Sequence, residues 1–96
     1  MNSPRSISDW LEAELDKKLA TFATDQEKYR HLIVCLSSWS RKYQRFEDLG
    51  EQPFNRPHPE FGDMDAFAFR ILIADIERRM DALVRGDDRY HWNEPA

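Results

Sequence analysis

The chain has 96 residues, of which 41% are hydrophobic and 33% charged, and its formal net charge is −4. A chain of this length has room for one domain with a single, modest core. It contains no apolar run near the roughly 20 residues that a membrane-spanning helix needs, which argues against membrane association. The net negative charge disfavours a dedicated nucleic-acid-binding protein, because affinity for phosphate comes from clustered lysine and arginine.

Cysteine usage and the first residues bear on the compartment. Cys35 is the only cysteine, so the chain has no internal disulfide. The opening MNSPRSISDW lacks the apolar core of a secretory signal. We therefore expect a cytoplasmic protein, because the cytoplasm keeps thiols reduced.

The first predicted helix covers residues 7–23. Ser6 is a suitable N-cap, and Asp9 lies near the positive end of the helix dipole. Trp10 lies off the apolar stripe, so it either folds over the helix end or is offered to a partner. The stripe itself consists of Leu11, Leu15, Leu19 and Phe22.

The second predicted helix covers residues 25–48 and carries the dominant apolar pattern. Thr24 and Glu27 form a capping box at its start, and Gly50 is placed to end it. The short connection predicts that the first two helices are antiparallel neighbours. Steps of three and four residues, typical of one helical face, separate Tyr29, Leu32, Leu36, Trp39, Tyr43 and Phe46.

A proline-rich loop is expected over residues 51–62, because three prolines there remove backbone donors. Its two aromatic residues, Phe54 and Phe61, are expected to pack on the core. The remaining residues, 86–96, form a tail with Tyr90 and Trp92, which we expect to dock on the body of the protein or on another chain.

The third predicted helix covers residues 64–85, with Asp63 as its N-cap and Gly86 at its end. Its main apolar stripe consists of Phe69, Leu72, Ile73, Ile76, Met80 and Leu83. A second, roughly opposite stripe consists of Met64, Phe67, Ala68, Ile71 and Ala74, after which Asp75, Arg78 and Arg79 occupy that side. A helix that is apolar all round is buried on more than one side, so residues 64–74 need cover on both faces.

This surplus of apolar surface leaves two alternatives. Either the loop and tail cover it within one chain, or two chains cover it in a homodimer, which we favour. The candidate partner interface consists of Trp10, Met64, Phe67, Ile71, Tyr90 and Trp92.

A charged surface is the second candidate site. Residues 24–46 hold five basic and two acidic side chains, whereas residues 47–69 hold one basic and six acidic ones. This asymmetry steers a charged partner, or the acidic segment folds beside the basic helix. The candidate basic face consists of Arg30, Arg41, Lys42 and Arg45. Nucleic-acid binding by this face is an alternative, although no aromatic platform accompanies it.

His31 and Cys35 are four residues apart, a spacing that allows both to hold one metal from one helical face. Two ligands do not complete a site, and a thiol beside an apolar stripe behaves as a small hydrophobe. We therefore predict no catalytic residue, no metal and no cofactor, and keep a metal protein or enzyme based on this pair as an alternative.

The segment from Ser6 to Glu14, SISDWLEAE, resembles the opening of the small acidic helical immunity proteins that neutralise nuclease bacteriocins, and Phe46, Glu47 and Pro53 echo a later part of that family. The acidic, tyrosine-containing toxin-binding segment of that family has no counterpart here. Its place is taken by residues 56–59, RPHP. No site residue is carried over from the resemblance.

The sequence thus predicts one all-α domain over residues 1–96. It comprises an antiparallel helix pair, a proline-rich crossover and a third helix, an arrangement that dimerisation would complete. We predict a small non-enzymatic protein of the adaptor or inhibitor type that binds protein partners through helical apolar surface. The sequence does not identify the partner or the pathway.

Overall fold

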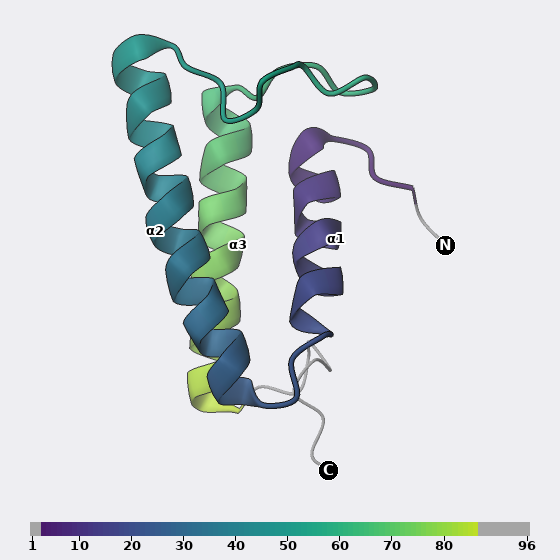
Figure 1. The fold of residues 1–96 in the computed structure, drawn as a ribbon, viewed down its shortest axis with the longest axis vertical. Helices are drawn as coiled ribbons and strands as arrows, with labels where there is room; N and C mark the ends of the chain where they lie inside the picture. Colours follow the sequence, from purple (N-terminus) through teal and green to yellow (C-terminus); the bar gives the residue numbers. More distant parts are fainter. Residues whose placement is uncertain (1–2, 87–96) are drawn as a thin grey trace.

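The computed structural model describes residues 3–86 and contains three helices: α1 (Ile7–Leu19), α2 (Asp25–Leu49) and α3 (Ala66–Arg85). Figure 1 shows them side by side, with α3 between the other two. The described part of the chain has no strand, only an isolated bridge between His58 and Gly62. The predicted all-α, three-helix architecture is therefore confirmed. None of the described helices is long and apolar enough to cross a membrane.

Side-chain caps fix where the first two helices begin. The Ser6 hydroxyl accepts a hydrogen bond from the Asp9 N–H at 3.2 Å, and the Thr24 hydroxyl accepts one from the Glu27 N–H at 3.1 Å. The return bond of the capping box differs from the expected one, because the Thr24 hydroxyl donates to the Glu27 carboxylate at 3.0 Å. Both caps satisfy donors that have no partner within the helix.

The third helix begins two residues later than predicted, and its N-cap is Asp65 rather than Asp63. The Asp65 carboxylate accepts from the Ala68 N–H at 2.8 Å. The reason lies in the loop: the Gln52 side-chain amide bonds both the N–H and the carbonyl of Met64, each at 2.8 Å. These bonds engage the Met64 backbone groups outside the helix.

The first helix ends at Leu19, short of the predicted residue 23. The Thr21 hydroxyl donates to the Lys18 carbonyl at 2.6 Å, and the Phe22 N–H bonds the Leu19 carbonyl at 3.2 Å. Such local bonds compete with the regular helical ladder. Helix α2 extends to Leu49 and ends at Gly50. The φ of Gly50 is 70°, the left-handed conformation that glycine adopts without strain.

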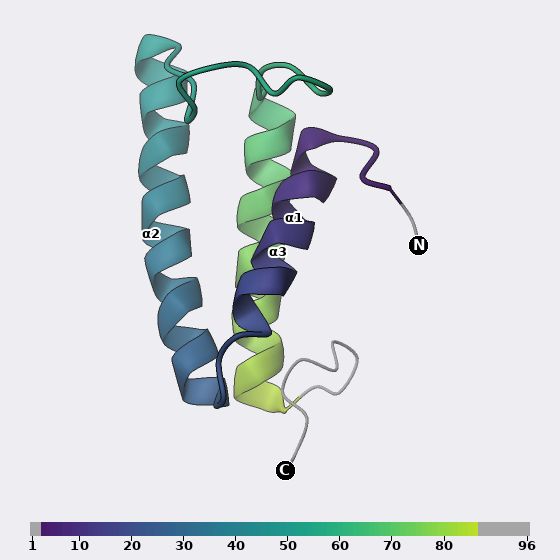
Figure 2. The same cartoon turned by 45° about the vertical axis from the view of Figure 1, so that its right-hand side comes forward.

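The helices alternate in direction, and α3 is the central one. Helix α2 runs antiparallel to both α1 and α3 (Figures 1 and 2). The most extensive packing is between α2 and α3, and α1 packs chiefly on α3. The predicted antiparallel orientation of α1 and α2 is thus present, and Leu15 and Leu19 of α1 share a core cluster with Leu32 of α2. The more extensive packing of both helices is nevertheless on α3.

Two apolar clusters fill the space between the helices. One joins Leu15 and Leu19 of α1 to Leu32 of α2 and to Leu72 and Ile76 of α3. The other lies at the loop end and consists of Ile7, Met64, Ala68 and Phe69, with Trp10, Leu11, Trp39, Tyr43, Phe46 and Phe61 packed around them. The loop crosses this end of the bundle, as Figure 1 shows. Its Phe61 packs against the second cluster, and the ring of Phe54 contacts those of Trp10 and Trp39.

Candidate functional site

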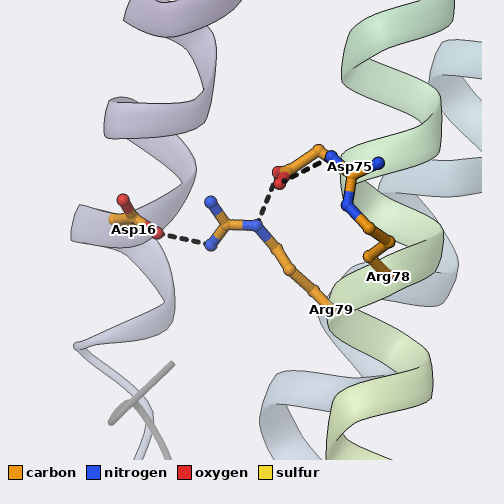
Figure 3. A network of polar contacts seen from close by, with 4 residues as sticks. All are labelled: Asp16, Asp75, Arg78 and Arg79. Atoms are coloured by element: carbon orange, nitrogen blue, oxygen red, sulfur yellow. Dashed lines mark hydrogen bonds and ion pairs between the residues drawn. The ribbon is translucent and has the colours of Figure 1, made fainter. Parts of the chain in front are cut away.

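A buried charge network links α1 to α3 (Figure 3). Asp75 and Arg79 lie one turn apart on α3 with side chains only 7% and 6% exposed, and Arg79 Nε donates to Asp75 Oδ2 at 2.6 Å. The same guanidinium reaches across to the Asp16 carboxylate on α1. Arg78 Nη2 lies 3.8 Å from the second Asp75 oxygen. One buried cation thus holds carboxylates from two helices.

Glu12 of α1 joins this network as a half-buried carboxyl group. Its pKa is raised from 4.5 to about 7, chiefly by burial and also by the nearby Asp75 carboxylate and a hydrogen bond between the two side chains, while the charge of Arg79 acts in the opposite direction. The nearby surface depression, of about 250 Å³, is lined by Ser3, Pro4, Asp9, Glu12, Ala13, Asp16 and Arg79. A carboxyl group titrating near neutrality is a feature of both acid–base sites and structural ion-pair networks. Because Arg79 engages carboxylates on both helices, we interpret the network as a tether between α1 and α3.

Glu12→Gln should flatten the pH dependence of stability. The pKa of Glu12 is higher in the folded than in the unfolded chain, so the stabilisation is present at low pH and is lost as pH rises through about 7. We expect the free energy of unfolding to fall by on the order of 1 kcal/mol across this range in the parent protein, because water screens a half-exposed group. Urea unfolding of parent and variant at acidic and alkaline pH measures the difference. The exposed Glu14→Gln change is the control, and an unaltered pH dependence in Glu12→Gln would contradict the interpretation.

This network was not predicted from the sequence, whose pattern placed Asp75 and Arg79 on the outer side of the helix. The structure corrects that assignment, since both residues are buried against α1. A signal was present in the spacing. Asp75 and Arg79 are four apart and flank Leu72 and Ile76, so they lie at the border of the main apolar stripe.

The second apolar stripe of α3 divides into a covered and an open part. Met64 and Ala68 are buried beneath the start of α1 and the loop, with Met64 only 2% exposed. Met64 is therefore a core residue, and it does not belong to the candidate partner interface in which the sequence pattern placed it. Phe67 is 68% exposed, while Ile71 is half-buried beside it.

A groove of about 430 Å³ runs beside Phe67. Apolar groups of Ile7, Phe61, Ala68 and Ile71 line it, together with polar and charged residues of the chain start and the loop: Arg5, Ser6, Ser8, Glu60, Asp63 and Asp65. This groove is the only part of the predicted interface where an exposed large aromatic adjoins a hollow within residues 3–86.

Trp10 lies at the loop end of the bundle, where it is half-buried. Its ring meets the rings of His58 and Phe54 edge-on, with centroids 4.7 Å and 6.4 Å away. The loop therefore covers much of the Trp10 ring. This agrees with the alternative in which Trp10 folds over the end of its helix, rather than the one in which it is offered to a partner. Tyr90 and Trp92, the other aromatic members of the predicted interface, lie outside the described residues.

The basic face of α2 is partly engaged within the chain. Lys42 Nζ lies 4.7 Å from the Trp39 ring centroid and donates to the Ser38 hydroxyl at 3.2 Å. Arg45 forms a two-pronged ion pair with Glu51, at 2.7 Å and 3.0 Å. Among residues 3–86, this is the one ion pair between the acidic segment and the basic helix. Arg30 and Arg41 are exposed and form no ion pair within the described part of the chain.

His31 and Cys35 lie together as their spacing predicts, with Nε2 3.4 Å from Sγ. Burial raises the pKa of the Cys35 thiol and lowers that of the His31 imidazole, so both groups favour their neutral forms. A neutral thiol is a poor nucleophile. Across residues 3–86, no group of three or more His, Cys, Asp or Glu side chains is arranged to hold a metal ion.

Comparison with models of protein families finds no match for this chain, and comparisons with curated proteins and with solved structures find no significant match either. The resemblance of the segment at Ser6–Glu14 to immunity proteins gains no support from these comparisons. The function is therefore inferred from the residues and the geometry of the chain itself.

Proposed function

We propose that this protein is a small, non-enzymatic protein-binding module of the adaptor or inhibitor type, which self-associates through a surface centred on Phe67. The observation that carries the proposal is the 68% exposure of this phenylalanine on a helix whose neighbouring apolar residues are buried. Aromatic side chains, phenylalanine among them, are enriched in protein interfaces relative to the rest of the surface. A large exposed aromatic beside a hollow also tends to be covered by a partner, because water exposure of contiguous apolar surface is unfavourable.

The surroundings of Phe67 support binding of a protein rather than of a small metabolite. Apolar and charged residues line the groove together, a mixture that is common in protein interfaces. A cytoplasmic setting is part of the proposal. It is supported by the single cysteine, which is free and whose pKa is raised by burial, so that it remains a thiol at neutral pH.

Phe67→Asp should abolish self-association and leave the fold intact. A carboxylate at the centre of the contact would be desolvated without a partner, which costs several kcal/mol. Sedimentation velocity at several protein concentrations measures the mass of the parent and the variant, and circular dichroism verifies the helical content.

Val34→Asp is the matched control, because Val34 is similarly exposed, at 64%, but lies on α2. We expect the control to associate as the parent does. A parent protein that is monomeric at every concentration, or an equal effect of both substitutions, would overturn the proposal.

A further inference from the structure

The outer face of α3 carries a seam of residues at spacings of four, three and four: Phe67, Ile71, Ala74 and Arg78. At roughly 100° per residue these positions fall within a stripe about 60° wide. The same spacing brings two helices together in coiled coils and many helix pairs. Helices α1 and α2 occupy other sides of α3, and Phe67 and Arg78 remain mostly exposed.

Charge is distributed unevenly along this seam. The charged residues that line the groove beside Phe67, at the N-terminal end of α3, are three acidic ones and one basic one: Glu60, Asp63, Asp65 and Arg5. Neither Glu60 nor Asp63 takes part in an ion pair within the residues that the structure describes. Arg78 lies at the far end of the seam, 59% exposed and only loosely held by Asp75 at 3.8 Å. The seam is thus acidic at one end, apolar in the middle and basic at the other.

We infer that the occupant of this seam is a second copy of the chain, with the two α3 helices packed antiparallel about a two-fold axis between Phe67 and Ile71. This inference rests on the proposed function and adds the partner geometry. An antiparallel arrangement places Phe67 of each copy against Ile71 of the other. It also places Arg78 of each copy beside the acidic Glu60–Asp63 end of the other, so that both ends are complementary in charge.

Arg70 lies near the two-fold axis of this dimer, so the Arg70 side chains of the two copies would approach each other with like charges. Its guanidinium is turned away from the seam, since Nε donates to the Tyr43 hydroxyl of α2 at 2.9 Å. Like-charge repulsion across the axis is therefore small. A parallel arrangement would be repulsive at both ends of the seam. It would place the acidic ends of the two copies beside each other, and their basic ends beside each other as well.

A charge-exchange experiment tests the geometry. One variant carries Glu60→Arg and Asp63→Arg, and the other carries Arg78→Glu. Each alone should form homodimers roughly tenfold more weakly than the parent, which corresponds to about 1.4 kcal/mol, because like charges face each other twice. An equimolar mixture should form a heterodimer with near-parental affinity, since every contact is again between opposite charges. Differently tagged chains and sedimentation velocity measure the heterodimer directly.

The mixture also controls for folding, because only folded chains can restore the contact. Arg41→Glu, an exposed charge reversal on α2, should leave the dimer unchanged. Variants that dimerise like the parent, or a mixture that stays as weak as its components, would overturn the antiparallel geometry. If Phe67→Asp still abolishes association in that case, the proposed function stands and only the geometry is wrong. If Phe67→Asp has no effect, the proposed function itself fails.

Discussion

Arg79→Met should lower the free energy of unfolding by about 3–5 kcal/mol, a large part of the total stability of a small domain. Methionine retains the apolar stem but removes the guanidinium that Asp75 and Asp16 share. Asp75 would then be buried beside the Glu12 carboxyl group, and the nearest remaining cation among the described residues would be the exposed Arg78, 3.8 Å away. Urea unfolding at neutral pH, followed by circular dichroism, measures the change.

Two further variants show whether the cost comes from the unpaired charge. Arg78→Met removes an exposed cation and should change stability by less than about 1 kcal/mol. The double change Asp75→Leu with Arg79→Met removes both buried charges and should recover most of the loss, because apolar replacements of buried ion pairs are often neutral or stabilising. A loss below about 1 kcal/mol for Arg79→Met would contradict the burial of the pair.

Phe69→Ala should also cost about 3–5 kcal/mol, because it leaves a cavity at the centre of the loop-end cluster. The Phe69 ring is fully buried. Three aromatic rings of α2 surround it, with centroids at 5.0, 5.4 and 6.0 Å, and these belong to Phe46, Tyr43 and Trp39. The transition midpoint in urea should therefore move to a much lower concentration.

Phe67→Ala is the matched control, because it deletes the same side chain two residues earlier on the same helix. At a concentration where the chain is monomeric, we expect a change within about 0.5 kcal/mol, as for other exposed sites. Similar losses for the two phenylalanines would mean that the inner and outer faces of α3 are wrongly assigned.

Much of the local structure follows from the sequence. The Ser6 and Thr24 caps and the glycines at 50 and 86 mark helix ends correctly, because each acts on backbone groups a few residues away. The periodic stripe of α2 correctly identifies its inner face. The start of α3 is misplaced by two residues because the Gln52 side chain, twelve residues from Met64, engages the backbone groups of that residue.

The candidate site is predicted only in part, and its residues show why. Phe67 and Ile71 are indicated by the second stripe of the third helix, but the same pattern includes Met64 and Ala68, which the structure buries. Periodicity reports which residues share a helical face and carries no information on which segment covers that face. The charges of Asp75 and Arg79 suggested solvent, whereas each is buried because the other is its ion-pair partner.

The sequence by itself determined that the described part of the chain forms three helices, where most of the helix ends lie, and which residues share each helical face. Caps, glycines and periodicity act over a few residues, so a local pattern is sufficient to specify these features. Only the tertiary structure decided that α3 is central, that α1 lies along it and that the loop covers Trp10 while Phe67 stays open. These outcomes depend on contacts between segments distant in the chain, such as Asp16 with Arg79 and Gln52 with Met64. Burial is a property of such neighbours, and no local pattern specifies them.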